Sequence, residues 1–387
     1  MKYIQSLPEP SPNALQHSQK LINRIHKEIG DNDGSIPFHR YMEMALYQPR
    51  LGYYVAGTHK IGAKGDFMTA PEISPLFSQC ISNQCYEIIK KGGGCILELG
   101  AGTGKMAADI LLALEKQQLP DKYYILDLSP DLKQRQLKTI QTLAPHLLKN
   151  VEWLTQLPKD FIGIILGNEV LDAMPVSVFT QQADTIFEHH VIWEDKQLRE
   201  QLRPASNTLT HAVKKLNIPT TATPYTSEIN LNIDGWLKSL SHCLKQGVIL
   251  LADYGYPRNE YYLEERNKGT LICHYQHMVN EAALHYPGLQ DITASVDFTA
   301  IAEAADKCSL TVVGFTSQAA FLTNADLESY FMKALDENPN DQYKLAQQIR
   351  TLSLPSEMGE RFKFIALTKN HDNPLCGFKS HNQLYRL

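Results

Sequence analysis

The chain has 387 residues, of which 43% are hydrophobic and 20% charged, with 37 Lys and Arg against 42 Asp and Glu, a net charge of −5. This composition is typical of a globular protein and excludes a disordered or fibrous one. Because no basic run breaks the balance, the sequence does not predict a nucleic-acid-binding protein. The seven scattered cysteines never follow a Cys-x-x-Cys spacing, so they predict a reducing compartment and neither a disulfide framework nor a zinc cage.

No stretch of sequence approaches the roughly 18 apolar residues that a membrane-spanning helix needs. The start, MKYIQSLPEPSP, carries one Lys and lacks both the apolar core of a secretory signal and the Arg-rich character of a transit peptide. We therefore expect a cytoplasmic protein without a membrane span.

The first 90 residues are predicted to form a region of helices and loops that contributes to the substrate site. Apolar residues at helical spacing predict one helix over 15–30, ending at Gly30, and a second over 37–47. Residues 51–75 are rich in Gly, Tyr, Lys, Asp and Thr and predict a long loop. Ordered loops of that length are commonly functional.

Residues 91–387 alternate between apolar strands and helices in the manner of an α/β core. Strands are predicted at residues 95–99, 123–128, 161–169, 247–255, 312–316 and 364–368, with a helix over 130–148 after the second. This alternation predicts a mostly parallel sheet with helices on both faces. Two long intervals, at about 180–245 and 256–296, are predicted insertions that form a lid over the carboxyl ends of the strands.

A glycine-rich turn is the most specific feature of the core. The segment ILELGAGTGKM (96–106) places three glycines between a strand and a helix: Gly100, Gly102 and Gly104. Glycine permits a positive φ and a close approach of ligand to backbone, and the helix that follows offers free N–H groups. A phosphate-binding P-loop is excluded, because Leu99 occupies the position of its first glycine and Met106 replaces its metal-binding hydroxyl.

Three interpretations of this turn stay open, namely a dinucleotide site, an S-adenosylmethionine (SAM) site and a purely structural turn. A dinucleotide site requires an acid about 20 residues after the turn, and Asp127 comes later than that. A SAM site is favoured, because Glu98 ends the first strand and Asp127 ends the second, where it can bind ribose hydroxyls. In the structural interpretation Glu98 is a strand-end acid and Asp127 caps the next helix.

The segment GNEVLDAMPV (167–176) brings two carboxylates and an amide to the end of a strand: Glu169, Asp172 and Asn168. Paired carboxylates at this position can bind a guanidinium in bidentate fashion beside a sulfonium, or act as a general base. In the alternative interpretation Asn168 and Asp172 cap a following helix. Strand-end placement favours the functional interpretation.

Three further segments carry polar side chains whose role the sequence leaves open. GDFMTAPE (65–72) contains Asp66 and Glu72, and its Thr69 or Glu72 could cap a helix. Tyr254 follows another strand and either stacks on a ligand or packs at the rim. Asp297 is a predicted helix N-cap. The histidine pairs lack companion ligands at suitable spacing, so no metal site is expected.

Taken in order, MALYQPRLGYY (44–54), GDFMTAPE, ILELGAGTGKM, LDLSPDL (126–132), GNEVLDAMPV and DITASVDF (291–298) resemble the MidA-type family of class I SAM-dependent methyltransferases. Mitochondrial members of that family act in respiratory complex I assembly by dimethylating an arginine. The resemblance covers nearly the whole chain, although Ala101 stands where a proline is common and Asp127 where Glu is usual. It implies a Rossmann-like seven-stranded sheet, SAM as methyl donor and a protein substrate presenting an arginine.

Strand-end placement then assigns roles within the resemblance. The cofactor-binding residues are predicted to be Glu98, Gly100, Gly102, Gly104, Asp127, Leu128 and Asn168. Glu169, supported by Asp172 or Asp66, is predicted to hold the guanidinium. A non-catalytic SAM-binding assembly factor and a small-molecule methyltransferase stay open as alternatives. The sequence is also compatible with a homodimer.

Overall fold

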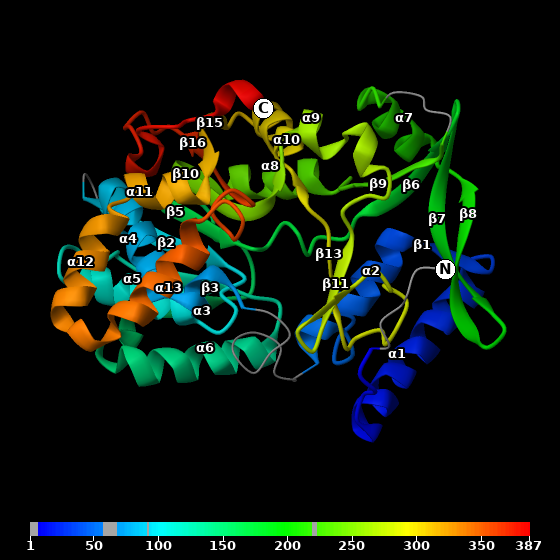
Figure 1. Ribbon diagram of the computed structural model, residues 1–387, viewed down its shortest axis with the longest axis horizontal. Helices are drawn as coiled ribbons and strands as arrows, with labels where there is room; N and C mark the ends of the chain where they lie inside the picture. Colours follow the sequence, from blue (N-terminus) through cyan, green and yellow to red (C-terminus); the bar gives the residue numbers. More distant parts are fainter. Residues whose placement is uncertain (1–6, 57–67, 91–92, 219–222) are drawn as a thin grey trace.

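The structure is a computed structural model that describes residues 7–56, 68–90, 93–218 and 223–387. Within these ranges, seven strands of the central sheet follow one hydrogen-bonded path (Figure 1). Their order is β15 (Thr311–Ser317), β16 (Phe362–Lys369), β10 (Leu244–Tyr256), β5 (Phe161–Asn168), β2 (Cys95–Leu99), β3 (Tyr123–Leu126) and β4 (Val151–Leu154). The short β14 (Val296–Asp297) pairs with β10 beside this path.

Most neighbours in the central sheet are parallel, which confirms the predicted fold class. The five neighbouring strands β4, β3, β2, β5 and β10 run in one direction. Only β16 is antiparallel to its neighbours, which are β10 and β15. The carboxyl ends of β2, β3, β5 and β10 consequently meet at one edge of the sheet. Each of the polar segments predicted to bind a ligand at a strand end lies at that edge.

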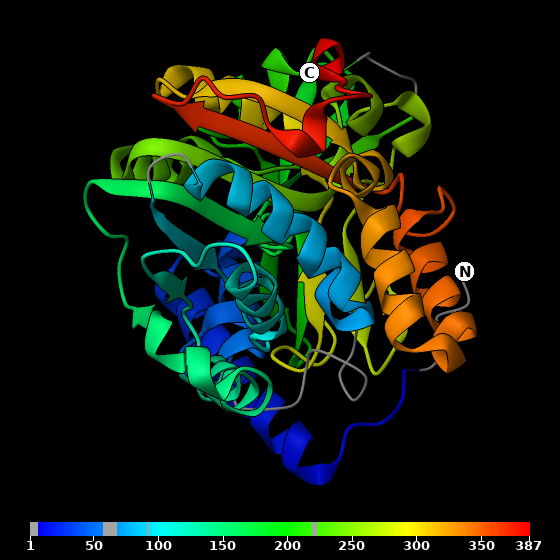
Figure 2. The same ribbon diagram turned by 90° about the vertical axis from the view of Figure 1, so that its left-hand side faces the viewer.

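Helices cover both faces of the central sheet. One face packs against α4 (Pro75–Ile89), α5 (Lys105–Glu115), α6 (Pro130–Leu143) and α11 (Gln318–Asn324), and the other against α8 (Ile233–Cys243) and α10 (Phe298–Lys307). Of two outer helices, α12 (Leu327–Glu337) packs against α4, and α13 (Gln342–Ser353) packs against α11 and α12 (Figure 2). No helix in the described ranges combines the length and apolar character needed to cross a bilayer.

A second group of elements, here called the peripheral unit, is seated over the carboxyl edge of the sheet (Figure 1). It contains α1 (Pro12–Asp31), α2 (Phe38–Tyr47), α7 (Asn207–Lys215) and an antiparallel sheet of β1 (Ser35–Pro37), β6 (Ser177–Gln182), β7 (Thr185–Glu194), β8 (Gln197–Pro204) and β9 (Tyr225–Ile229). It also contains β11 (Ile272–Tyr275), β12 (Met278–Asn280) and β13 (Asp291–Thr293). Apolar residues of α1, α2, β7, β11 and β13 share one buried cluster, so chain segments far apart in sequence form one wall above the sheet.

Two short helices connect these layers, α3 (Ala70–Ile73) before α4 and α9 (Arg258–Tyr261) after β10. Helix α4 belongs to the first 90 residues, and α8 to the end of the interval at 180–245. Both nevertheless pack on the central sheet. The polypeptide between β5 and α8 therefore leaves the core, builds most of the antiparallel sheet and returns.

The sequence prediction was wrong at the ends of two helices and missed one strand of the central sheet. Helix α1 begins after the N-cap Ser11 and continues through Gly30, so that glycine does not end it. The helix predicted over 130–148 ends at Leu143, because Pro145 cannot continue it, and a 3₁₀ segment follows. Strand β4 was not predicted. It is an edge strand in which only Val151 is buried, so its sequence lacks an apolar run.

Candidate active site

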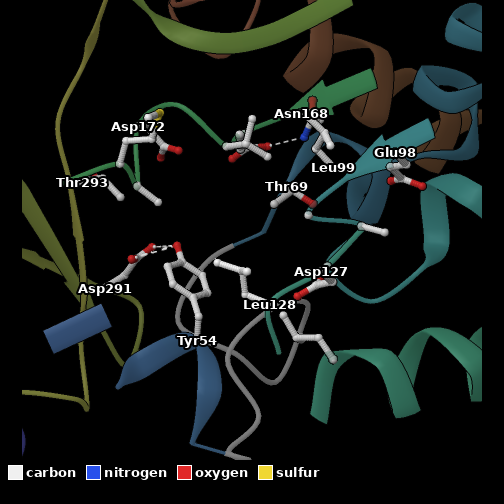
Figure 3. A pocket seen from close by; sticks show the side chains of 18 of the residues that line it. Tyr54, Thr69, Glu98, Leu99, Asp127, Leu128, Asn168, Asp172, Asp291 and Thr293 are labelled. Carbon is white, nitrogen blue, oxygen red and sulfur yellow. Dashed lines mark hydrogen bonds between the residues drawn. The ribbon is translucent and has the colours of Figure 1, made fainter. Parts of the chain in front are cut away.

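A cavity of about 1110 Å³ lies between the carboxyl edge of the central sheet and the peripheral unit. Figure 3 shows acids on two sides of it, with Glu98 and Asp127 on one side and Asp172 and Asp291 on the other. We call these sides the cofactor half and the acceptor half. Within the described ranges, no cluster of His, Cys, Asp or Glu could hold a metal ion.

The glycine turn forms the floor of the cofactor half. Gly100, Gly102 and Gly104 all have positive φ, at 62°, 51° and 82°. A Cβ on Gly104 would lie 2.8 Å from the backbone Cα of Gln136 in α6, and one on Gly100 would lie 3.0 Å from the Val170 side chain. The turn therefore needs glycine both for its backbone conformation and for its close packing against neighbouring segments.

A single amide, that of Gln136, ties the acid of the second strand to this turn. Its Nε2 donates to Asp127 at 2.8 Å and to the carbonyl of Gly102 at 3.2 Å, while its Oε1 accepts from the Trp153 indole at 2.9 Å. The Ser129 N–H also donates to Asp127, at 2.9 Å. Burial raises the pKa of Asp127, and these hydrogen bonds oppose the rise.

The residues of the cofactor half fit SAM. The Asp127 carboxylate lines the cavity and can accept from ribose hydroxyls, and next to it the side chain of Leu128 is 76% exposed and offers an apolar face for a purine. Asn168 Oδ1 is buried, and no described residue donates to it, so it can accept from an ammonium group. Glu98 is 2% exposed and accepts from the Tyr123 hydroxyl at 2.7 Å. Burial raises the pKa of Glu98 to about 7, and a neighbouring cation would lower this pKa by stabilising the ionised carboxylate.

In the acceptor half, Glu169 is held from three directions. Its backbone has a φ of 53°, a conformation that costs a non-glycine residue about 1–2 kcal/mol, and its N–H donates to the Ala252 carbonyl at 2.9 Å. Its side chain accepts from Asn168 Nδ2 at 3.0 Å and from the Ala70 N–H. Burial, together with the charge of Asp172, raises the pKa of Glu169 to about 8.

A second acid, Asp172, is oriented by a third that does not line the cavity. The buried Asp253 accepts from the N–H groups of Leu171 and Asp172 at 2.9 and 3.2 Å, which sets the path of the loop after β5. Burial raises the pKa of Asp172 to about 6, and a hydrogen bond from Tyr254 opposes the rise. No helix follows this loop, which leads directly into β6, so the interpretation of Asp172 as a helix cap was wrong.

The segment that begins at Thr69 joins the two halves. Glu72 accepts a hydrogen bond from the Thr103 hydroxyl in the glycine turn, while the Ala70 N–H reaches Glu169. Neither Thr69 nor Glu72 caps α3 with its side chain, contrary to one interpretation of the sequence. The predicted residue Asp66 lies outside the described residues.

Two other predicted residues have clear places. Tyr254 lines the cavity and packs edge-on against Phe362, with ring centroids 5.5 Å apart. Asp297 accepts from the Ala300 N–H at 3.1 Å and caps α10, as predicted, and it also pairs with Arg258. Asp297 thus belongs to the framework and does not line the large cavity.

Many residues that line the cavity were missed by sequence analysis, among them Tyr54 and Asp291. Asp291 starts β13, and both of its carboxylate oxygens accept from the Tyr54 hydroxyl, at 2.9 and 3.0 Å. The two residues lie 237 positions apart, and neither follows a strand of the central sheet. The only signal was their presence in segments with blocks of family resemblance, around LGYY (51–54) and DIT (291–293).

The acceptor half is therefore rich in acidic side chains. No described lysine or arginine forms an ion pair with Glu169 or Asp172. Uncompensated buried carboxylates are expensive, and they favour a cationic ligand that restores the charge balance. The arrangement can hold a cation beside the cofactor half.

Comparison with known proteins agrees with this geometry. Residues 80–316 match the profile of a family of S-adenosyl-L-methionine-dependent methyltransferases. The chain is 27% identical to the protein arginine methyltransferase NDUFAF7, mitochondrial, of Danio rerio over 377 residues, which cover 86% of this chain and 83% of that one. It is 25% identical to the Homo sapiens protein of that name, with coverage of 95% and 86%.

A solved structure is similar over the whole fold. A methyl transferase superfamily member from Burkholderia thailandensis, bound to S-adenosyl-homocysteine, has a TM-score of 0.94 and 38% sequence identity, covering 99% of this chain and 100% of that one. A native crystal structure from the same organism gives a TM-score of 0.92 at the same identity and coverage.

The Asp127→Ala variant should lose most of its affinity for SAM, because the carboxylate that can bind the ribose hydroxyls is removed. Calorimetric titration of wild type and variant with SAM and, separately, with NADH measures this. Asp131→Ala is the matched control, since Asp131 lies in the first turn of α6 and does not line the cavity. Binding of NADH without SAM, or equal SAM affinity in both variants, would contradict the assignment.

The Glu169→Gln variant should unfold at a higher temperature than wild type near pH 8, with a gap that closes toward pH ~5. The pKa of Glu169 rises from 4.5 to about 8 on folding, so wild-type stability is lost as the pH rises through that window. Each kcal/mol of difference shifts Tm by about 2–4 °C. Thermal melts as a function of pH test this, with the exposed Glu337→Gln as control. A gap independent of pH would show that another cause dominates.

Proposed function

This chain belongs to the family of SAM-dependent methyltransferases whose profile it matches, and on that premise we propose that its acceptor is the guanidinium of an arginine in a protein substrate. The observation that carries the proposal is a pair of carboxylates, the half-buried Glu169 and the buried Asp172, with no described cation paired to either. Arginine stays protonated at any physiological pH, and its planar fork of donors matches carboxylates.

The names of two relatives support this proposal. Proteins of Danio rerio and Homo sapiens that resemble the chain over most of its length are named protein arginine methyltransferases. The sequence resemblance also suggests a respiratory complex I subunit as the substrate, and the scattered cysteines suggest a reducing compartment such as the cytoplasm as the place of reaction. We carry both forward as proposals, together with the homodimer.

The reaction would be an in-line displacement, for which SAM supplies an electrophilic methyl group on a sulfonium. Glu98, Asp127 and Asn168 hold the cofactor above the glycine turn. Glu169 and Asp172 hold the guanidinium and offset the repulsion between two cations, so that one terminal nitrogen faces the methyl group. Such positioning supplies much of the rate enhancement in transfer reactions.

Glu169 is also the best-placed base. When the N–CH₃ bond forms and the S–CH₃ bond breaks, the attacking nitrogen loses a proton, and the Glu169 carboxylate can accept it. In its ionised form, a carboxylate whose pKa is raised to about 8 is a stronger base than an ordinary one. Asn168 and the Ala70 N–H keep this carboxylate in place during the transfer.

Glu169→Gln should reduce methyl transfer about 100-fold or more while SAM affinity stays unchanged, because the variant keeps the shape but loses charge and basicity. Transfer of labelled methyl groups from SAM to an arginine-containing peptide library, followed by amino-acid analysis of the product, measures this. In wild type, acceptor affinity should rise with pH up to about pH 8, since the ionised Glu169 binds the cation.

The exposed Glu337→Gln serves again as control and should transfer at the wild-type rate. Full turnover in Glu169→Gln would refute the assigned role. Methylation of lysine peptides in preference to arginine peptides would refute the proposed acceptor. SAM binding without any methylated product would favour a non-catalytic assembly factor.

A further inference from the structure

One positively charged side chain lines the large cavity without a partner of its own. The charged residues that line the cavity are mostly Asp and Glu, and the described Lys and Arg among them are Lys105 and Arg361. Lys105 forms an ion pair with Asp109. Arg361 is exposed, and no described residue forms an ion pair or a hydrogen bond with its guanidinium. Its N–H donors are therefore available to an anion that enters from outside.

The backbone that carries Arg361 is fixed on both sides. Its own carbonyl accepts from the Gly255 N–H at 3.3 Å, which ties it to the end of β10. In the turn before it, the Gly359 N–H donates to the Leu354 carbonyl at 3.0 Å, and the Gly359 carbonyl accepts from the Ala319 N–H, also at 3.0 Å. Only the side chain of Arg361 has to be ordered when a ligand binds, which limits the entropic cost of binding.

Strand order and register place Arg361 on the acceptor side of the cavity. It directly precedes β16, and three strand spacings, about 14 Å, separate β16 from the strand β2 that leads into the glycine turn. Phe362, the first residue of β16, pairs with Tyr254. Tyr254 lies three residues beyond Leu251, which is level with Leu99 at the end of β2. Arg361 therefore stands about 10 Å farther out than the start of the glycine turn, at about 3.3 Å per residue.

The exposure of Arg361 marks an opening of the cavity. Next to it the lining consists of Met358 and Phe362, which are joined by a backbone hydrogen bond of 3.0 Å. A substrate arginine that enters through this opening extends its long side chain inward to the acids after β5 and leaves its backbone near the rim. The residues before and after that arginine then lie within reach of the Arg361 guanidinium.

The sign of this charge is opposite to that of most of the cavity. The acids attract the arginine of a substrate, but they repel an acidic residue beside it and so disfavour acidic sequences. A cation at the opening reverses that effect at one place only. Charges on the rim of a binding site chiefly set specificity and the rate of association. Arg361 is thus placed to bind a residue next to the arginine, while Glu169 and Asp172 hold the arginine itself.

We propose that Arg361 binds the carboxylate of an Asp or Glu close to the target arginine in the protein substrate, so that the enzyme prefers arginines in acidic sequences. The inference rests on the proposed function. A guanidinium and a carboxylate form two parallel hydrogen bonds in one plane, which makes arginine better suited than lysine to bind a carboxylate. The cofactor carries a carboxylate as well, and the position of Arg361 beyond β10 favours the substrate as the source.

The experiment compares two series of peptides based on acetyl-Gly-Gly-Arg-Gly-Gly-amide. In one series a single glycine is replaced by Asp, position by position, and in the other by Asn. Calorimetric dissociation constants are measured with full-length protein saturated with S-adenosylhomocysteine, for wild type, Arg361→Gln and Arg361→Glu. Arg350→Gln is the matched control, because Arg350 is exposed on α13 and does not line the cavity. The Tm and the affinity for S-adenosylhomocysteine report whether each variant is folded.

In wild type, Asp at one or more positions should bind about three- to fivefold more tightly than Asn at the same position, the upper end of the range for a solvent-exposed ion pair. Arg361→Gln should remove this preference, and Arg361→Glu should reverse it in favour of Asn. The control should keep the wild-type ratio. Because ions screen the pair, the wild-type preference should shrink between about 0.05 and about 0.5 M salt. A merely structural role would change neither this ratio nor its salt dependence.

Other outcomes overturn the inference in distinguishable ways. Equal binding of Asp and Asn peptides at every position refutes the role of Arg361 and leaves the proposed function standing. An Asp preference that persists in Arg361→Gln refutes the inference by assigning the preference to another residue. Loss of affinity for S-adenosylhomocysteine in Arg361→Gln, at an unchanged Tm, refutes it by placing the residue in the cofactor site. If wild type binds none of the peptides, the proposed acceptor is refuted, and the inference with it.

Discussion

Several carboxylates lie around one cavity, and no described cation is paired to Glu169 or Asp172. Much of the surrounding structure depends on this constraint. Each buried charge destabilises the fold unless it is hydrogen-bonded or neutralised. The structure provides donors accordingly, including the backbone N–H groups at Asp253, the amide of Asn168 at Glu169 and the phenol of Tyr54 at Asp291. These donors orient the acids without removing their charge, which leaves the site ready for a cation.

Separate chain segments connect the cofactor and acceptor halves. The short segment around α3 contacts the glycine turn through Glu72 and the acceptor acid through the Ala70 N–H. Gly100 packs against Val170, which follows Glu169 directly. A displacement of the glycine turn would therefore move the residues that are proposed to hold the acceptor. This tight packing suits a reaction that depends on the distance between two bound groups.

The peripheral unit explains why a methyltransferase core carries such long additions. Its sheets supply little to the cofactor half. They place one wall of the cavity and cover the carboxyl edge of the central sheet, where several of the acids are buried. A lower local dielectric strengthens their attraction for a cation. Figure 1 shows this unit as a second body of elements beside the central sheet, built from the N-terminal helices α1 and α2 and from the two long insertions.

The sequence by itself determined six of the seven strands along the path of the central sheet, the glycine turn and the acids at the strand ends, because apolar runs and the residue after a strand are local signals. It could not determine β4, whose edge position leaves it without an apolar run. Only the tertiary structure decided that Asp253 orients the loop while Asp172 lines the cavity, and that Asp291 meets Tyr54. These relations depend on packing between segments more than 80 residues apart, which no local pattern encodes.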